Sequence, residues 1–127
     1  MHRTEFERMT KELYGTGPER LFSRNPGYEV FRHEASGKWF ALVMDLPASR
    51  LGLPGDDVID VANLKCDPDL AAVLRHRDGF HPAYHMNKEH WLTVELACVD
   101  SETMADLLAM SHGLTAPRPA KKHRRAS

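Results

Sequence analysis

Residues 84–91, YHMNKEHW, bring two imidazoles, an amide, an ammonium group and an indole into one short segment. The imidazoles of His85 and His90 can exchange protons near neutral pH and can ligate metal ions. Lys88 can pair with a phosphate group, and the indole of Trp91 can stack on a nucleic-acid base. The segment is therefore a candidate ligand-binding surface.

The same segment also fits a structural corner between two strands. Asn87 can accept backbone hydrogen bonds in a tight turn and tolerates a left-handed backbone. The aromatic and methionine side chains around it would anchor such a corner to the core. The two interpretations are compatible, because a corner can present its remaining side chains to a ligand.

Four histidines, at positions 76, 81, 85 and 90, lie close enough in the sequence for a zinc site to be considered. A zinc site needs three or four ligands and a surrounding shell that orients them. Pro82 prevents the helix that would place His81 and His85 on one face. We therefore expect no metal site and no cofactor.

Nucleophilic catalysis would need Cys66, Cys98 or a serine beside a histidine base that a third group orients. The sequence contains no GxSxG or phosphate-loop signature, so an enzyme is an alternative without a supporting motif. The two cysteines form no CxxC pair, which argues against a disulfide framework. Since no apolar run approaches the roughly 20 residues that cross a bilayer, we expect a cytoplasmic protein that does not enter a membrane.

Charge is divided unevenly along the chain. The formal net charge is −1, but residues 1–115 contain all 18 acidic residues and only 12 of the 17 lysines and arginines. The remaining segment, APRPAKKHRRAS, has no acid and little apolar surface to bury. We predict a single domain, residues 1–115, followed by a disordered basic tail, residues 116–127. The bases of the tail are Arg118, Lys121, Lys122, Arg124 and Arg125.

Hydrophobic periodicity and turn residues predict three helices and five strands. Thr4 and Glu7 form a capping box for the first helix. Asp67 is expected to cap the second helix, and either Asp100 or Ser101 the third. The helices should end near Gly15, Gly79 and Gly113, the apolar face of the second should be Leu70, Ala71, Val73 and Leu74, and the strands should span residues 28–33, 38–45, 58–66, 80–86 and 91–97.

This order predicts an α+β fold of two layers, in which an antiparallel β-sheet of about five strands packs against the helices. In the last strand Leu92, Val94 and Leu96 should face the helices, which places Trp91 on the opposite, open face of the sheet. Two alternatives remain for the indole, because a bulge could turn it inward or the stems of neighbouring lysines could cover it.

Several motifs resemble the MmcQ/YjbR family of small bacterial proteins. They are KWFALV, LKCDPDLAAVLR, PAYHMNKEHWLTV and LLAMSHGL, and their order and spacing fit the family over residues 6–114. The resemblance implies a fold like that of CyaY, the bacterial frataxin homologue. It also implies a likeness to a "double wing" DNA-binding module.

The chain departs from the family pattern at three places. The family usually has Asp-Gly after the final strand and Ser-Tyr in the last helix, where this sequence has Ala97-Cys98 and Ser111-His112. Leu92 occupies a position that is often polar.

The sequence thus predicts a cytoplasmic binding module that contacts DNA weakly and in a salt-dependent manner, through the open sheet face and the basic tail. A protein-interaction module without a nucleic-acid partner and an undetected small-molecule enzyme are the alternatives. Besides the five tail bases, the candidate contacts are Lys65, His85, Asn87, Lys88, His90 and Trp91.

Overall fold

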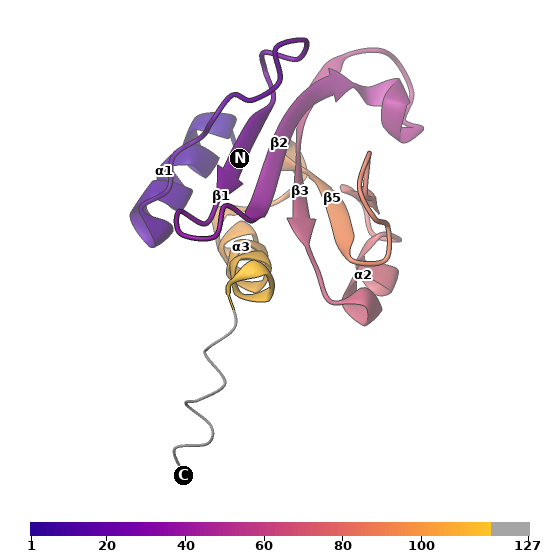
Figure 1. Ribbon diagram of the computed structural model, residues 1–127. Coiled ribbons are helices and arrows are strands. Elements are labelled where there is room, and N and C mark those ends of the chain that lie inside the picture. The colour runs from indigo at the N-terminus through magenta and orange to yellow at the C-terminus, as the bar shows by residue number, and fades with distance from the viewer. Residues whose placement is uncertain (118–127) are drawn as a thin grey trace.

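The computed structural model describes residues 1–117, and the ribbon in Figure 1 follows their path. Five antiparallel strands form one sheet in the order β1-β2-β3-β5-β4, accompanied by helices. The predicted α+β class, with a sheet layer and a helix layer, is confirmed. The elements are α1 (Arg3–Tyr14), β1 (Glu29–Arg32), β2 (Trp39–Pro47), η1 (Ala48–Leu51), β3 (Val58–Lys65), α2 (Pro68–Leu74), β4 (Phe80–Pro82), β5 (Trp91–Glu95), η2 (Leu96–Cys98) and α3 (Ser101–Thr115).

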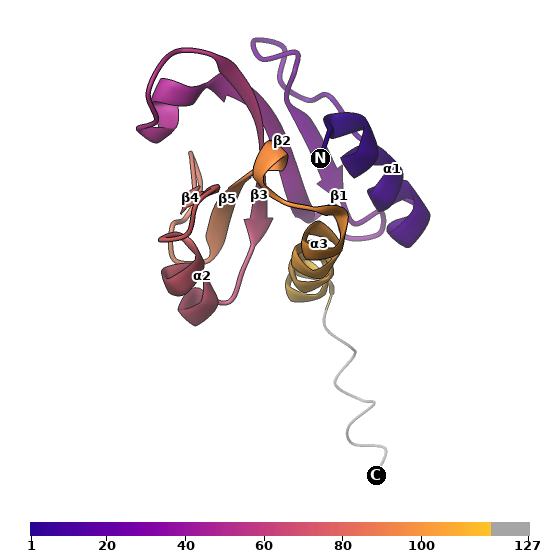
Figure 2. The ribbon, with the colours of Figure 1, turned by 180° about the vertical axis from the view of Figure 1, so that it is seen from behind.

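The three α-helices pack on one face of the sheet. Figure 2 shows the same ribbon turned by 180° from the view of Figure 1. Phe6 of α1, Ala71 of α2 and Met104 of α3 belong to the same buried cluster. β5 contributes Leu92 and Val94 to this cluster, so the predicted orientation of that strand is confirmed. Within residues 1–117 no helix is both long enough and apolar enough to cross a membrane.

Two of the predicted helix caps are confirmed. Oδ2 of Asp67 accepts hydrogen bonds from the backbone N of Asp69 (3.2 Å) and of Leu70 (3.3 Å) at the start of α2. Oδ1 of Asp100 accepts a bond from the backbone N of Thr103 (2.8 Å) at the start of α3. Each carboxylate satisfies N–H groups that have no partner inside the helix.

The predicted cap of α1 is wrong. The helix begins at Arg3, and Oε1 of Glu5 accepts a hydrogen bond from the backbone N of His2 at 2.9 Å. The helix therefore starts before the predicted capping box of Thr4 and Glu7. His2 and Glu5 have the same spacing as Thr4 and Glu7, and the box that forms is the one of His2 and Glu5.

Helix α2 is shorter than predicted. It ends at Leu74, because the backbone N of Arg77 bonds to the backbone O of Leu74 (2.8 Å) and turns the chain. Gly79 completes the turn with a φ of 87°. Val73 is 63% exposed, so its predicted place on the apolar face is wrong. With a helix of only two turns, the core receives fewer side chains than the periodicity suggested.

The face of the sheet away from the helices is open over a smaller area than predicted. A second buried cluster occupies much of it, because residues from the loops fold over the strands. Its buried members are Val30, Leu42, Met44, Leu46 and Val61, and the side chains packed against them are Phe22, Tyr28, Trp39, Leu51, Ile59, Tyr84 and Met86.

Candidate functional site

β4 ends at Pro82, earlier than predicted, because the backbone that follows bonds to side chains of the sheet. The backbone N of Tyr84 donates to Oγ1 of Thr93 (2.9 Å), and Nδ2 of Asn63 donates to the backbone O of Tyr84 (2.8 Å). The Thr93 hydroxyl donates to Oδ1 of Asn63, and both side chains are fully buried. This polar network fastens residues 83–90, the connecting loop, onto the sheet.

The connecting loop contains the predicted corner. Oδ1 of Asn87 accepts hydrogen bonds from the backbone N of Glu89 (2.8 Å) and of His90 (3.0 Å), which confirms the expected Asx turn. Nζ of Lys88 donates to the backbone O of Ala83 at 2.8 Å. The ammonium group therefore joins the two ends of the loop, and the corner interpretation accounts for both side chains.

The left-handed residue of the loop is His85, with a φ of 61°, and not Asn87. Histidine is among the residues that enter this region more often than most. The His85 ring is exposed and lies 3.9 Å from the Tyr84 ring, measured between centroids. It lines a cavity formed with Phe22, Tyr28 and Arg50, and Trp91 is not part of that lining.

A groove of about 300 Å³ lies where the open face of the sheet meets the C-terminal end of α3, and we call it the tryptophan groove. Its walls include the half-buried indoles of Trp39 and Trp91. Lys65 is the β3 partner of Trp91, and Lys38 directly precedes Trp39. The groove thus combines planar apolar surfaces with two positive charges. The other lining residues are Met86, Leu114 and Thr115.

The structure brings only part of the predicted site together. Lys65 and Trp91 line the tryptophan groove, so the indole is neither turned under the helices nor fully exposed. Asn87 and Lys88 bond within the connecting loop, and His90 is exposed beside them. The predicted tail contacts lie outside the described residues, and they are Arg118, Lys121, Lys122, Arg124 and Arg125.

Trp39 is the groove residue that the sequence pattern did not reveal. Simple alternation along β2 places it on the face opposite Leu42. In the structure Phe31 pairs with Ala41 but Arg32 pairs with Trp39, so one extra residue forms a bulge in β2. The bulge reverses the alternation and turns Trp39 toward the groove.

A cluster of aromatic rings supports the end of α3 that borders the groove. His112 stacks on Tyr14 with ring centroids 4.0 Å apart, and Nε2 of His33 lies 2.8 Å from Oγ1 of Thr115. Burial lowers the pKa of His112, and the nearby His33 lowers it further. Among residues 1–117, no three histidine, cysteine, aspartate or glutamate side chains are arranged to hold a metal ion.

Comparison with known proteins gives consistent matches over most of the chain. A model of the YjbR family matches residues 11–114. The uncharacterised Bacillus subtilis protein YyaQ is 38% identical over 114 residues, which are 89% of this chain and 97% of that protein. A Pseudomonas syringae crystal structure, at 42% identity and a TM-score of 0.88, covers 91% of this chain and 100% of its own. A Deinococcus radiodurans structure shares the fold at 24% identity and a TM-score of 0.68, covering 97% of this chain and 85% of its own.

Proposed function

This chain belongs to the YjbR family, and we propose that it is a small cytoplasmic module that binds DNA weakly through the tryptophan groove and a basic tail. In this proposal the domain is residues 1–115 and the tail is residues 116–127. The two free cysteines, Cys66 and Cys98, support a reducing compartment. The expected likeness to CyaY and to a double-wing DNA-binding module stays a prediction.

The observation that carries the proposal is the grouping of two indoles and two ammonium groups on one sheet surface. An exposed indole face stacks on an unpaired base, and such stacking does not depend strongly on sequence. Trp39 and Trp91 each keep part of their surface accessible. Lys38 and Lys65 take part in no ion pair within residues 1–117, so both charges can approach a phosphate.

The position of the groove relative to the tail supports the same proposal. Thr115, the last residue of α3, lines the groove, and the five tail bases follow it in the sequence. The domain itself contains six more acids than bases, so its net charge opposes a nucleic acid. Binding should therefore depend on the tail for most of its electrostatic attraction.

Titration of a fluorescein-labelled single-stranded oligodeoxynucleotide at several salt concentrations tests this proposal. If five tail bases and two groove lysines each neutralise a phosphate, the slope of log K against log [salt] should be about −5. Deletion of residues 118–127 should leave a slope of about −1.4, from Lys38 and Lys65 alone. Binding that is insensitive to salt and survives the deletion would refute the role of the tail.

Substitutions in the groove test the folded surface separately. Trp91→Leu keeps an apolar side chain but removes the stacking plane, so affinity should fall about 5- to 150-fold. Lys38→Gln combined with Lys65→Gln should also weaken binding, whereas Lys11→Gln on the exposed side of α1 should not. Equal DNA affinities for all these variants would exclude the groove as a contact surface, whereas the absence of DNA binding by the unaltered protein would favour a protein-interaction module or a small-molecule enzyme.

A further inference from the structure

A second cavity, of about 550 Å³, lies on the same sheet face but is not part of the tryptophan groove. Trp39 and Met86 line both cavities and so form the wall between them. The volume is within the range of pockets that enclose small molecules. We call this cavity the aromatic pocket, and its lining includes Phe22, Tyr28, Trp39, Met44, Arg50 and His85.

Three aromatic rings define the shape of the aromatic pocket. Phe22 meets Tyr28 edge to face, with ring centroids 5.7 Å apart and an interplanar angle of 66°. It meets Trp39 in the same manner, at 5.9 Å and 81°. Leu42 and Met44, both buried in β2, also line it. Rings arranged in this way present both faces and edges to the pocket, which suits a flat aromatic ligand.

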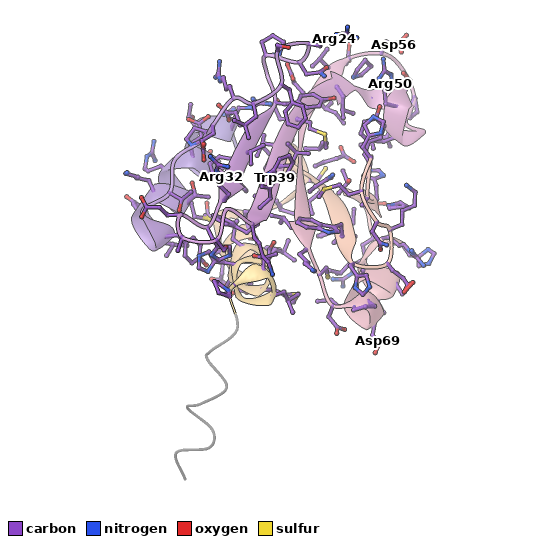
Figure 3. All side chains as sticks on the ribbon, viewed as in Figure 1. Arg24, Arg32, Trp39, Arg50, Asp56 and Asp69 are labelled. Carbon is purple, nitrogen blue, oxygen red and sulfur yellow. The ribbon has the colours of Figure 1, made fainter. Side chains whose placement is uncertain are left out.

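The charged side chain of the aromatic pocket is Arg50, at η1, which Figure 3 labels together with Trp39. Its Nη1 donates to the hydroxyl of Tyr84 at 3.1 Å, and it takes part in no ion pair within residues 1–117. A guanidinium has five N–H donors, so most of them stay available. Burial raises the pKa of Tyr28, which keeps that hydroxyl neutral. The lining thus carries positive charge and matches an anion.

The wall that carries His85 is fixed before any ligand arrives. Asn63 and Thr93 hold both backbone groups of Tyr84, the residue before His85. His85 itself has a left-handed backbone, with a φ of 61°, which only a few per cent of non-glycine residues adopt. A prearranged wall lowers the entropy lost on binding.

We propose that the aromatic pocket binds a planar aromatic carboxylate. The ring packs against Phe22, Tyr28 and Trp39, and the carboxylate accepts hydrogen bonds from the guanidinium of Arg50, with His85 as a second donor. A cationic aromatic ligand does not fit, because Arg50 would repel it. The inference does not depend on DNA binding, since the groove lysines play no part in it.

The test is an NMR titration of the ¹⁵N-labelled protein with 2-naphthoate, with 2-naphthamide as the uncharged analogue. Saturable shifts should appear at the Trp39 indole N–H and at the backbone of residues 84–86. The amide should bind about 10- to 100-fold more weakly, because hydrogen bonds to a charged group are stronger than neutral ones. Arg50→Met should weaken naphthoate binding by a similar factor, and Arg50→Lys by less.

Two variants separate this inference from the proposed function. Arg77→Met removes an exposed arginine outside the aromatic pocket and should bind naphthoate as the unaltered protein does. Lys38→Gln with Lys65→Gln should weaken DNA binding but leave naphthoate binding unchanged. Equal affinity for the acid and the amide, or undiminished binding by Arg50→Met, would overturn the inference.

Discussion

Replacing Thr93 with valine should expose the contribution of the buried polar network. Valine has nearly the same shape, so the substitution leaves no cavity and removes only the hydroxyl. The hydroxyl accepts from the backbone N of Tyr84 and donates to Oδ1 of Asn63, and Thr93 and Asn63 are fully buried. The substitution therefore leaves one donor and one acceptor without their partner.

Each unsatisfied buried group costs about 1–3 kcal/mol, so the two groups left by Thr93→Val should lower the free energy of unfolding by about 2–6 kcal/mol. For a domain of this size, each kcal/mol corresponds to about 4 °C, which gives a fall in Tm of roughly 8–24 °C. Urea unfolding followed by circular dichroism measures the free energy directly. Thr4→Val, at an exposed position in α1, is the matched control and should change stability by less than about 0.5 kcal/mol.

The same variant should loosen the connecting loop. Amide hydrogen exchange at Tyr84 should accelerate more than exchange in β5, because the lost bond is the one that holds that amide. A loss of stability no larger than that of Thr4→Val, with unchanged exchange at Tyr84, would refute the assigned role of the network.

Three further substitutions test the packing and the histidine cluster. Met104→Ala should cost about 2–5 kcal/mol in urea unfolding, because the side chain is fully buried, and a cost below 1 kcal/mol would contradict that. Gly79→Ala should lower the free energy of unfolding more than Gly55→Ala does. Both glycines have a positive φ, but only at Gly79 would the new methyl group overlap Cys98. Equal losses of stability would contradict this. The pKa of His112 in the folded protein lies below its ordinary 6.5, so the free energy of unfolding should be highest above about pH 6.5 and fall as the pH drops toward the folded pKa. His112→Tyr should reduce this loss of stability at acid pH. If the free energy of unfolding depended on pH as steeply in the variant as in the unaltered protein, His112 would be ruled out as its source.

Patterns that involve residues a few positions apart were readable from the sequence. Asp67 and Asp100 cap their helices as predicted, and Asn87 makes the expected turn, because each bonds to backbone only two or three residues away. Alternation along β5 correctly assigned Leu92 and Val94 to the helix side. The motifs of the sequence also identified the family correctly.

The candidate site was only partly accessible to the same reasoning. Trp91 was identified because side chains alternate regularly along β5, and Lys65 was named as a basic residue that could contact DNA. Trp39 was missed because a bulge, which depends on how β1 pairs with β2, turns it to the other face. Arg50 joins the aromatic pocket only because η1 and the connecting loop meet in space.

The tertiary structure alone decided which residues of the sheet and helices become buried. The local sequence VIDVANLK does not mark Asn63 as the buried partner of Tyr84, since the two residues lie on different segments and meet only when β3 pairs with β5. Likewise, Val73 has the periodicity of a core residue but stays exposed, because the chain turns away after Leu74. Local sequence sets which conformations a segment prefers, whereas burial depends on which distant segments come to lie against it, and that is a property of the whole fold.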